Sequence, residues 1–268
     1  MLKDITLGQY FPGNSFIHRL DPRTKLIVLV VYIVALFLAV NWVSYALMAA
    51  FLVLCIKIST IPAKSFIRGM KPLLMILIFT GVLNLFFTTD GKVLVDFWVI
   101  TITTAGLQRA IFMVVRILLL ICGTFLLTYT TSPISLTDGL EALMNPLKKL
   151  KVPVHELSMM MCIALRFIPT LIEETDKIMS AQKARGADFE SGTLMEKAKA
   201  LVPILVPLFI SAFRRADELA TAMECRCYQG GEGRTKMKLL RYKLWDFEAF
   251  GVGAGVLALI VVLRSFGV

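Results

Sequence analysis

The chain is poor in the residues that build metal and redox sites. Its 268 residues include two histidines, His18 and His155, and five cysteines. The cysteine number is odd and three of them lie in apolar stretches, so we expect reduced thiols instead of a secreted disulfide framework. Cys225 and Cys227 are close in sequence, but a metal site needs about four ligands and both histidines are distant. We therefore expect no metal and no cofactor.

Nucleotide-binding and catalytic signatures are also missing. The glycine-rich run at 230–233 has no Lys-Ser/Thr after it and no predicted strand before it, as a phosphate-binding loop requires. Three glycines at 251–255 lie inside an apolar run, where small residues let helices approach closely. No serine follows the nucleophile-elbow pattern of hydrolases. The chain is predicted to be non-catalytic, and any ATP that it depends on would bind to another chain.

Acidic residues are few relative to basic ones, 19 against 29, which gives a net charge of +10. No basic stripe with interleaved aromatic residues accompanies this excess, so we expect no binding to nucleic acid. Hydrophobic residues make up 57% of the chain, against about 45–50% in soluble domains. The mean hydropathy is +0.75. Lys and Arg crowd the cytosolic flanks of membrane helices, so a lipid bilayer is the predicted surrounding.

Long apolar runs predict an all-α, polytopic membrane protein with about five transmembrane helices plus long cytosolic or interfacial helices. A span needs about 20 apolar residues, and some runs are expected to extend into their flanks. Asp21 and Pro22 suit the N-cap and first position of the first helix. Residues 93–103 alternate and are rich in Val, Ile and Thr, which predicts a short strand pair at the membrane surface. The runs cover residues 26–40, 43–56, 72–87, 107–129 and 247–263.

The placement of Lys and Arg predicts the orientation. Four basic residues precede the first span and four follow the second, whereas the turn after the first span has none. The N-terminus is therefore predicted to be cytosolic, and no apolar segment of a cleavable signal peptide opens the chain. Four crossings place residues 132–243, with 17 of the 29 basic residues, in the cytosol, and the fifth places the C-terminus outside. The predicted parts are a four-span bundle (1–131), a cytosolic region (132–243) and a final membrane helix (244–268).

The cytosolic region is predicted to be helical throughout. An amphipathic stretch covers 135–150, and a long helix then runs from Pro153 to Arg185, with Gly186 as its stop and a kink at Pro169. A second long helix covers 193–227 and contains Pro203 and Pro207. The first half of each long helix is apolar and the second half is charged. An alternative topology inserts both as a hairpin, giving seven spans with the termini on the same sides.

The charged halves form a weak internal repeat. Residues 175–186 match residues 216–227 at a constant offset of 41, with identical Asp, Ala and Arg. The repeated arginines, Arg185 and Arg226, each have small neighbours and end a long helix. A guanidinium offers five donors in a fixed geometry, so each could enter a pocket of a partner. Two copies suggest a partner of two similar subunits; the alternative is that both arginines only complement helix C-terminal dipoles.

Two features together resemble the T component of energy-coupling factor transporters, the membrane component shared by vitamin and metal importers of the ATP-binding-cassette class. One is residues 8–25, GQYFPGNSFIHRLDPRTK, which are similar to the opening of that family. The other is a pair of Ala-Arg-Gly-like motifs, and the resemblance covers nearly the whole chain. The second motif departs from the pattern because cysteine flanks its arginine on both sides. The motifs are Ala184-Arg185-Gly186 and Cys225-Arg226-Cys227.

This resemblance implies a coupling subunit in the cell membrane, without catalysis of its own. Arg185 and Arg226, with their small neighbours, would dock onto two cytosolic ATPase subunits. The apolar halves of the long coupling helices would lie along the membrane surface and hold a membrane-embedded substrate-binding protein, the S component. ATP-driven closure would then move the helix ends and tilt the S component to release its cargo. The residues predicted to contact it are Met159, Met160, Met161, Pro169 and Pro207, the methionines as an adaptable apolar surface.

The alternative function is a self-sufficient secondary transporter. Such a protein would need paired ionisable groups or broken helices near the membrane midplane. The five predicted spans hold one deep cation, Arg116, and no deep carboxylate. Arg116 either marks a substrate path or is satisfied by polar groups of the bundle. An intramembrane enzyme would need a nucleophile–base or metal set that the sequence lacks, and the sequence does not identify the transported substrate.

Overall fold

The computed structural model describes residues 10–87, 93–97, 100–187, 189, 193–231 and 239–266. These residues fall into two compact units that meet in the chain at residues 139/140 and 239/240. We call the unit that contains residues 10–139 and 240–266 the bundle unit, and the unit formed by residues 140–239 the arm unit. Residues 8 and 9 of the opening segment and residues 232–233 of the glycine-rich run lie outside the described part.

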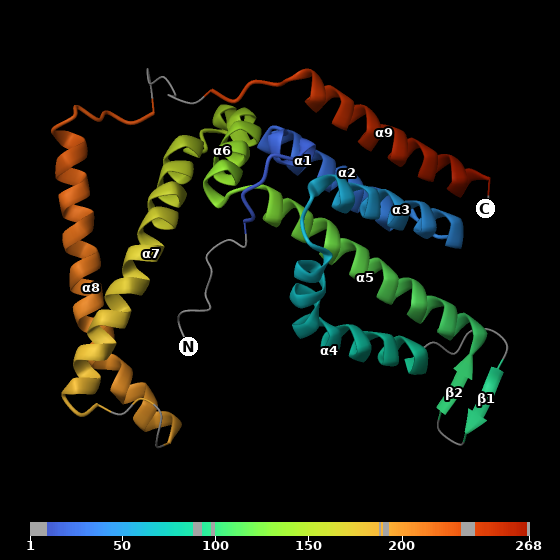
Figure 1. Ribbon diagram of the computed structural model, residues 1–268, viewed down its shortest axis with the longest axis horizontal. Coiled ribbons are helices and arrows are strands. Elements are labelled where there is room, and N and C mark those ends of the chain that lie inside the picture. Colours follow the sequence, from blue (N-terminus) through green and yellow to red (C-terminus); the bar gives the residue numbers. More distant parts are fainter. Residues whose placement is uncertain are drawn as a thin grey trace. The chain divides into compact units, whose positions relative to one another are not determined.

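The bundle unit is built from helices (Figure 1), and buried apolar side chains form its core. Helix α2 packs against α5 and α9, while α3 and α4 pack against α5. The N-cap of α2 is Asp21, as predicted, and its Oδ1 accepts a hydrogen bond from the backbone N–H of Arg23 at 2.9 Å. The core contains Tyr32, Leu36 and Met48. The helices are α1 (Phe16–Arg19), α2 (Pro22–Leu38), α3 (Trp42–Ser59), α4 (Ala63–Phe87), α5 (Thr104–Thr130) and α9 (Leu244–Ser265).

Five helices of the described part are long and apolar enough to cross a membrane, judged by length and composition. The fold is thus all-α and polytopic, as predicted, but the set of helices differs. Helix α2 has 17 residues, one fewer than α3, and is not among the five. Helix α7 (Val154–Ala184) is among them because its first half is apolar. The five are α3, residues 63–85 of α4, α5, α7 and α9.

The strand pair predicted between the third and fourth apolar runs is present. Strands β1 (Val93–Phe97) and β2 (Ile100–Thr103) are antiparallel, with Phe97 opposite Ile100. Strand β2 leads directly into α5, where the hydroxyl of Thr103 accepts a hydrogen bond from the N–H of Gly106 at 3.1 Å. This cap fixes the start of α5 at the end of the strand. The location of the pair at a membrane surface stays a prediction.

The arm unit contains the predicted long helices. Helix α7 has 31 residues, and α8 (Leu194–Glu224) also has 31. Thr193 and Glu196 form a capping box at the start of α8. The amphipathic stretch at 135–150 is split into α6 (Pro133–Met144), which crosses the unit boundary, and a 3₁₀ helix, η2 (Asn145–Leu150). Pro146 explains the split, because a proline disfavours α-helical backbone in the residue before it.

The three prolines inside the long helices lie at the centre of α7 and in the first half of α8. Pro169 is in α7, and Pro203 and Pro207 are in α8. Each removes one backbone hydrogen bond and crowds the preceding turn, which allows a helix to bend there. In Figure 1, α8 changes direction partway along its length. The charged second halves of both helices contain no proline.

Candidate docking site at the ends of two antiparallel helices

Helices α7 and α8 are joined by a carboxylate about two thirds of the way along each helix. Arg215 donates from Nη2 to Oε2 of Glu174 at 2.7 Å, and the hydroxyl of Ser211 donates to Oε1 of the same residue. The ion pair is partly exposed, with 34% and 23% of the two side chains accessible. Sequence reasoning missed this contact, although the two residues are separated by 41 positions, which is the offset of the repeat.

The two helices run in opposite directions. The hydroxyl of Tyr228, just after α8, donates to the sulfur of Met159 in the first turns of α7 at 3.2 Å. Gly231 lies against the ring of His155, where a Cβ on the glycine would be 2.6 Å from Cδ2. The end of α8 is therefore beside the start of α7, and the C-terminal ends of the pair point apart (Figure 1).

The contact between the helices divides them at equivalent positions. Arg185 follows Glu174 by 11 residues, and Arg226 follows Arg215 by 11 residues. Each of these docking segments, 174–185 and 215–226, is about 16 Å long at 1.5 Å per residue. The same offset of 41 relates the residues that join the helices and the residues that end them. The pair thus has an approximate local two-fold relation about the Glu174–Arg215 contact.

The two helix ends have the same backbone geometry. In each, the residue after the arginine has a positive φ, 89° for Gly186 and 53° for Cys227. Each end is closed by the same three backbone hydrogen bonds, which satisfy carbonyls that a helix end leaves open. At the α7 end, residues 185 and 187 donate their N–H groups to the carbonyl of 182, and residue 186 donates to that of 183. At the α8 end, residues 226 and 228 donate to the carbonyl of 223, and residue 227 donates to that of 224.

Both predicted docking arginines are exposed. In the part of the chain that the structure describes, neither guanidinium has a hydrogen bond or an ion pair. Their small neighbours are exposed as well, and the two cysteines are free thiols. An unpaired guanidinium between small side chains can approach a carboxylate or a carbonyl of another chain. The exposed neighbours are Ala184, Gly186, Cys225 and Cys227.

Apolar side chains are exposed along the first half of α8 and at the start of α7. Phe209 and Phe213 touch edge to face at 4.6 Å, and more than half of each side chain is accessible. Contiguous exposed apolar surface of this kind is typical of an interface with protein or lipid. The exposed residues are Leu201, Val202, Leu205, Val206, Phe209, Ile210 and Phe213 on α8, and Leu157, Met160 and Met161 on α7.

The remaining predicted contact residues divide into two groups. Pro169 and Pro207 are exposed, like Met160 and Met161. Met159 is half-buried, and its sulfur accepts the hydrogen bond from Tyr228. Met159 thus belongs to the contact between α7 and the end of α8.

A second polar contact fixes the start of α7 to α6. Glu141 is buried, and its carboxylate accepts from the hydroxyl of Ser158 at 3.0 Å. The Nδ1 atom of His155 lies 3.2 Å from the other oxygen of Glu141. His155 and Ser158 are three residues apart, so both lie on one face of the helix. No sequence signal identified this contact.

Arg116 in α5 is satisfied inside the bundle unit. Its Nε donates to the hydroxyl of Tyr45 at 2.9 Å, and its Nη2 donates to the carbonyl of Ala39 at 3.3 Å. Ala39 is the C-cap of α2, so the arginine supplies a donor to a helix end. These contacts favour the interpretation in which polar groups of the bundle satisfy this residue over a substrate path.

Comparison with known proteins gives one consistent result. Residues 13–237 match the family model CbiQ, described as cobalt transport protein. An "Energy-coupling factor transporter transmembrane protein EcfT" from Thermosediminibacter oceani is 54% identical over 265 residues, which is 99% of each chain. A protein of the same name from Bacillus subtilis is 49% identical over 99% of this chain and 97% of its own. One from Lactococcus lactis is 44% identical over 98% and 99%.

Proposed function

This chain belongs to the family of energy-coupling factor transporter transmembrane proteins, and we propose that it is the coupling subunit of an importer of the ATP-binding-cassette class. Membership makes it a multi-pass membrane protein with a role in transport. We propose that it carries out no catalysis itself. Its task would be to pass ATP-driven motion from two cytosolic ATPase subunits to a membrane-embedded S component that binds a vitamin or another micronutrient.

The equivalence of the two helix ends is the observation that carries this proposal. Two exposed arginines each lie 11 positions after one shared contact, at helix ends with the same three closing hydrogen bonds. Two equivalent ends suit a partner made of two similar subunits, each with a pocket for one guanidinium. An arginine that served only its own helix dipole would not require small residues on both sides.

The exposed apolar faces of α7 and α8 would contact the S component and the membrane surface. Two prolines interrupt α8, and the second half of α7 carries Glu173, Glu174 and Asp176, which a bilayer would penalise. We therefore place both helices below the bilayer and count α2 among the five spans. The protein would then lie in the cell membrane with its N-terminus in the cytosol.

Co-purification and transport test the proposal together. The tagged chain is co-expressed with candidate ATPase pairs and S components, and the double variant Arg185→Glu/Arg226→Glu is compared with Arg214→Glu. Arg214 is also exposed on α8, but lies outside both motifs. The double variant should lose both ATPases and all coupled uptake of tritiated riboflavin, thiamine, folate or biotin, while the control keeps them. Uptake that persists without any ATPase would instead support a secondary transporter.

A further inference from the structure

A buried polar cluster joins three segments of the bundle unit that are far apart in sequence. It consists of Asp21, Lys25, Thr130, Thr131 and Asp246, none of which is more than 8% exposed. We call this cluster the clasp. Buried ionisable groups are costly unless they are paired and hydrogen-bonded, so three of them in one place, together with two buried threonines, call for an explanation.

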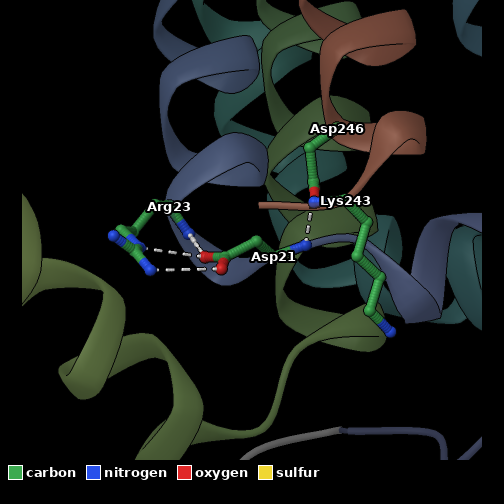
Figure 2. Close-up of polar contacts among 4 residues, drawn as sticks. All are labelled: Asp21, Arg23, Lys243 and Asp246. Atoms are coloured by element: carbon green, nitrogen blue, oxygen red, sulfur yellow. Dashed lines mark hydrogen bonds and ion pairs between the residues drawn. The ribbon is translucent and has the colours of Figure 1, made fainter. Parts of the chain in front are cut away.

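One side of the clasp holds the start of α9 on the start of α2. Oδ1 of Asp246 accepts from the backbone N–H of Asp21 at 2.9 Å, and Oδ2 accepts from the N–H of Lys243 at 2.7 Å. The same carboxylate thus binds both helix starts, as Figure 2 shows. A second connection lies beside it, because the guanidinium of Arg23 lies 4.6 Å from the ring centre of Tyr242.

The other side of the clasp holds the end of α5 on the same part of α2. The ammonium of Lys25 donates to the carbonyl of Thr130 at 2.9 Å, to the hydroxyl of Thr131 at 3.1 Å and to the carbonyl of His18 at 3.4 Å. These contacts use all three donors of the lysine. The carboxylates of Asp21 and Asp246 attract its charge.

The start of α6 is also held here. A Cβ on Gly139 would lie 2.9 Å from Cβ of Pro22, so α6 approaches the start of α2 with no side chain between them. Any larger residue at 139 would separate the two helices. The last segment of the bundle unit before the arm unit is thus held against α2 at Thr131 and at Gly139.

We propose that the clasp is the mechanical anchor of the coupling region. The chain passes into the arm unit after residue 139 and returns at residue 240. The clasp fixes Thr131 and Lys243, on the bundle side of these two crossings, to residues 21–25. With both points fixed, displacement of α7 and α8 by the partners would move the bundle unit. If the connections were loose, they would change conformation and the bundle unit would stay in place. Lys25 and Asp246 are positioning residues in this scheme, which rests on the function proposed above.

Hydrogen bonds suit an anchor better than apolar packing does. Replacing a buried ionic cluster by apolar side chains is often neutral for stability, so stability alone does not require charges here. Directional donors and acceptors specify one arrangement of the three segments and penalise slippage. A loosened clasp should therefore affect coupling more than it affects folding.

The test compares uptake with ATP hydrolysis in liposomes that contain the full complex. Thr131→Val removes one acceptor of Lys25 and keeps the shape, while Thr131→Ser keeps the hydroxyl and is its control. Lys25→Met removes the charge, and its control is Lys57→Met, an exposed lysine near the end of α3. The readouts are Tm, bound ATPases, ATP hydrolysis, and uptake of tritiated riboflavin, thiamine, folate or biotin.

For Thr131→Val we expect unchanged ATPase binding, a small decrease in Tm from one lost hydrogen bond, and uptake per ATP reduced about fivefold. Lys25→Met should reduce it more, and both controls should match the wild type. Unchanged uptake per ATP in Thr131→Val overturns the proposal, as does a loss of Tm, binding and uptake in parallel. If Lys25→Met does not fold, Thr131→Val decides the question alone.

A distance measurement gives an independent readout. Spin labels are placed at Ile134→Cys and Arg241→Cys, both exposed sites of the bundle unit that flank the clasp, in a background without the other exposed cysteines. The distance should stay the same with and without ATP in the wild-type complex and should broaden in Lys25→Met. A wild-type distance that changes with ATP overturns the anchor alone, whereas wild-type chain that binds no ATPase overturns the proposed function as well.

Discussion

The C-terminal ends of α7 and α8 have the same backbone conformation but differ in the residue that follows the arginine. Both close with the same hydrogen bonds and a residue of positive φ, yet that residue is glycine in one and cysteine in the other. A side chain in the left-handed region costs roughly 1–2 kcal/mol, so the α8 end keeps this geometry against its own preference. The comparison indicates that the shape of the helix end, with the arginine just before the turn, is what both copies preserve.

The sharpest test of this equivalence removes the arginines one at a time. Arg185→Ala and Arg226→Ala should each reduce bound ATPase from two subunits to one, because truncating an arginine at the centre of an interface weakens binding on the order of a hundredfold. Light scattering on the detergent-purified complex measures the stoichiometry. Arg214→Ala should bind two. Loss of both ATPases from one single variant, with none lost from the other, would show that the ends are not equivalent.

Thiol labelling can modify the α8 end and leave the α7 end unmodified. Cys225 and Cys227 are exposed at the α8 end, while residues 174–186 at the α7 end contain no cysteine. A maleimide that carries polyethylene glycol should therefore block one ATPase and leave the other bound. The double variant Cys225→Ser/Cys227→Ser should be insensitive to the reagent. Two ATPases on fully labelled wild-type protein would contradict docking at the α8 end.

Substitution of Gly186 tests the positive φ of the α7 end. Gly186→Ala should destabilise this end by about 1–2 kcal/mol, since φ is 89° and a Cβ is strained there. Hydrogen exchange at the amide of Ala187, which donates to the carbonyl of Gln182, should become faster. Cys227→Ala is the matched control, because that position already carries a Cβ, and it should change little. Equal effects of the two substitutions would remove the distinction between the ends.

The smallest effect should come from introducing a glycine at the α8 end. Cys227→Gly should stabilise the turn by about 0.5–1 kcal/mol, because glycine adopts positive φ without steric cost. Exchange of the Tyr228 amide, which donates to the carbonyl of Met223, should slow down. Faster exchange in this variant would mean that the cysteine side chain contributes favourable contacts of its own.

Local signals in the sequence located most of the fold. The start at Pro153, the stop at Gly186 and the absence of a strong breaker in between placed α7 within one residue of its observed ends, and the predicted range 193–227 placed α8 within three. Alternation of Val, Ile and Thr predicted the strand pair, and the offset of 41 identified the repeated arginines. These signals depend on residues close together in the chain, which is why they were readable.

Contacts between distant segments could not be read in this way. Lys25 was counted only as one of the basic residues that orient the first span, yet it is buried against the end of α5. Asp246 looks like an ordinary acidic residue before an apolar helix, and nothing local links it to Asp21. Helix α2 was predicted as the first span, but no local signal showed that it packs against α5 and α9.

The positions of the prolines indicate which parts of α7 and α8 can bend and which are stiff. Pro169, Pro203 and Pro207 all precede the Glu174–Arg215 contact, and no proline follows it in either helix. The docking segments, 174–185 and 215–226, would therefore be the stiffer parts of the two helices. The apolar parts could bend at their prolines and adapt to S components of different shape, while the proposed docking ends keep their geometry.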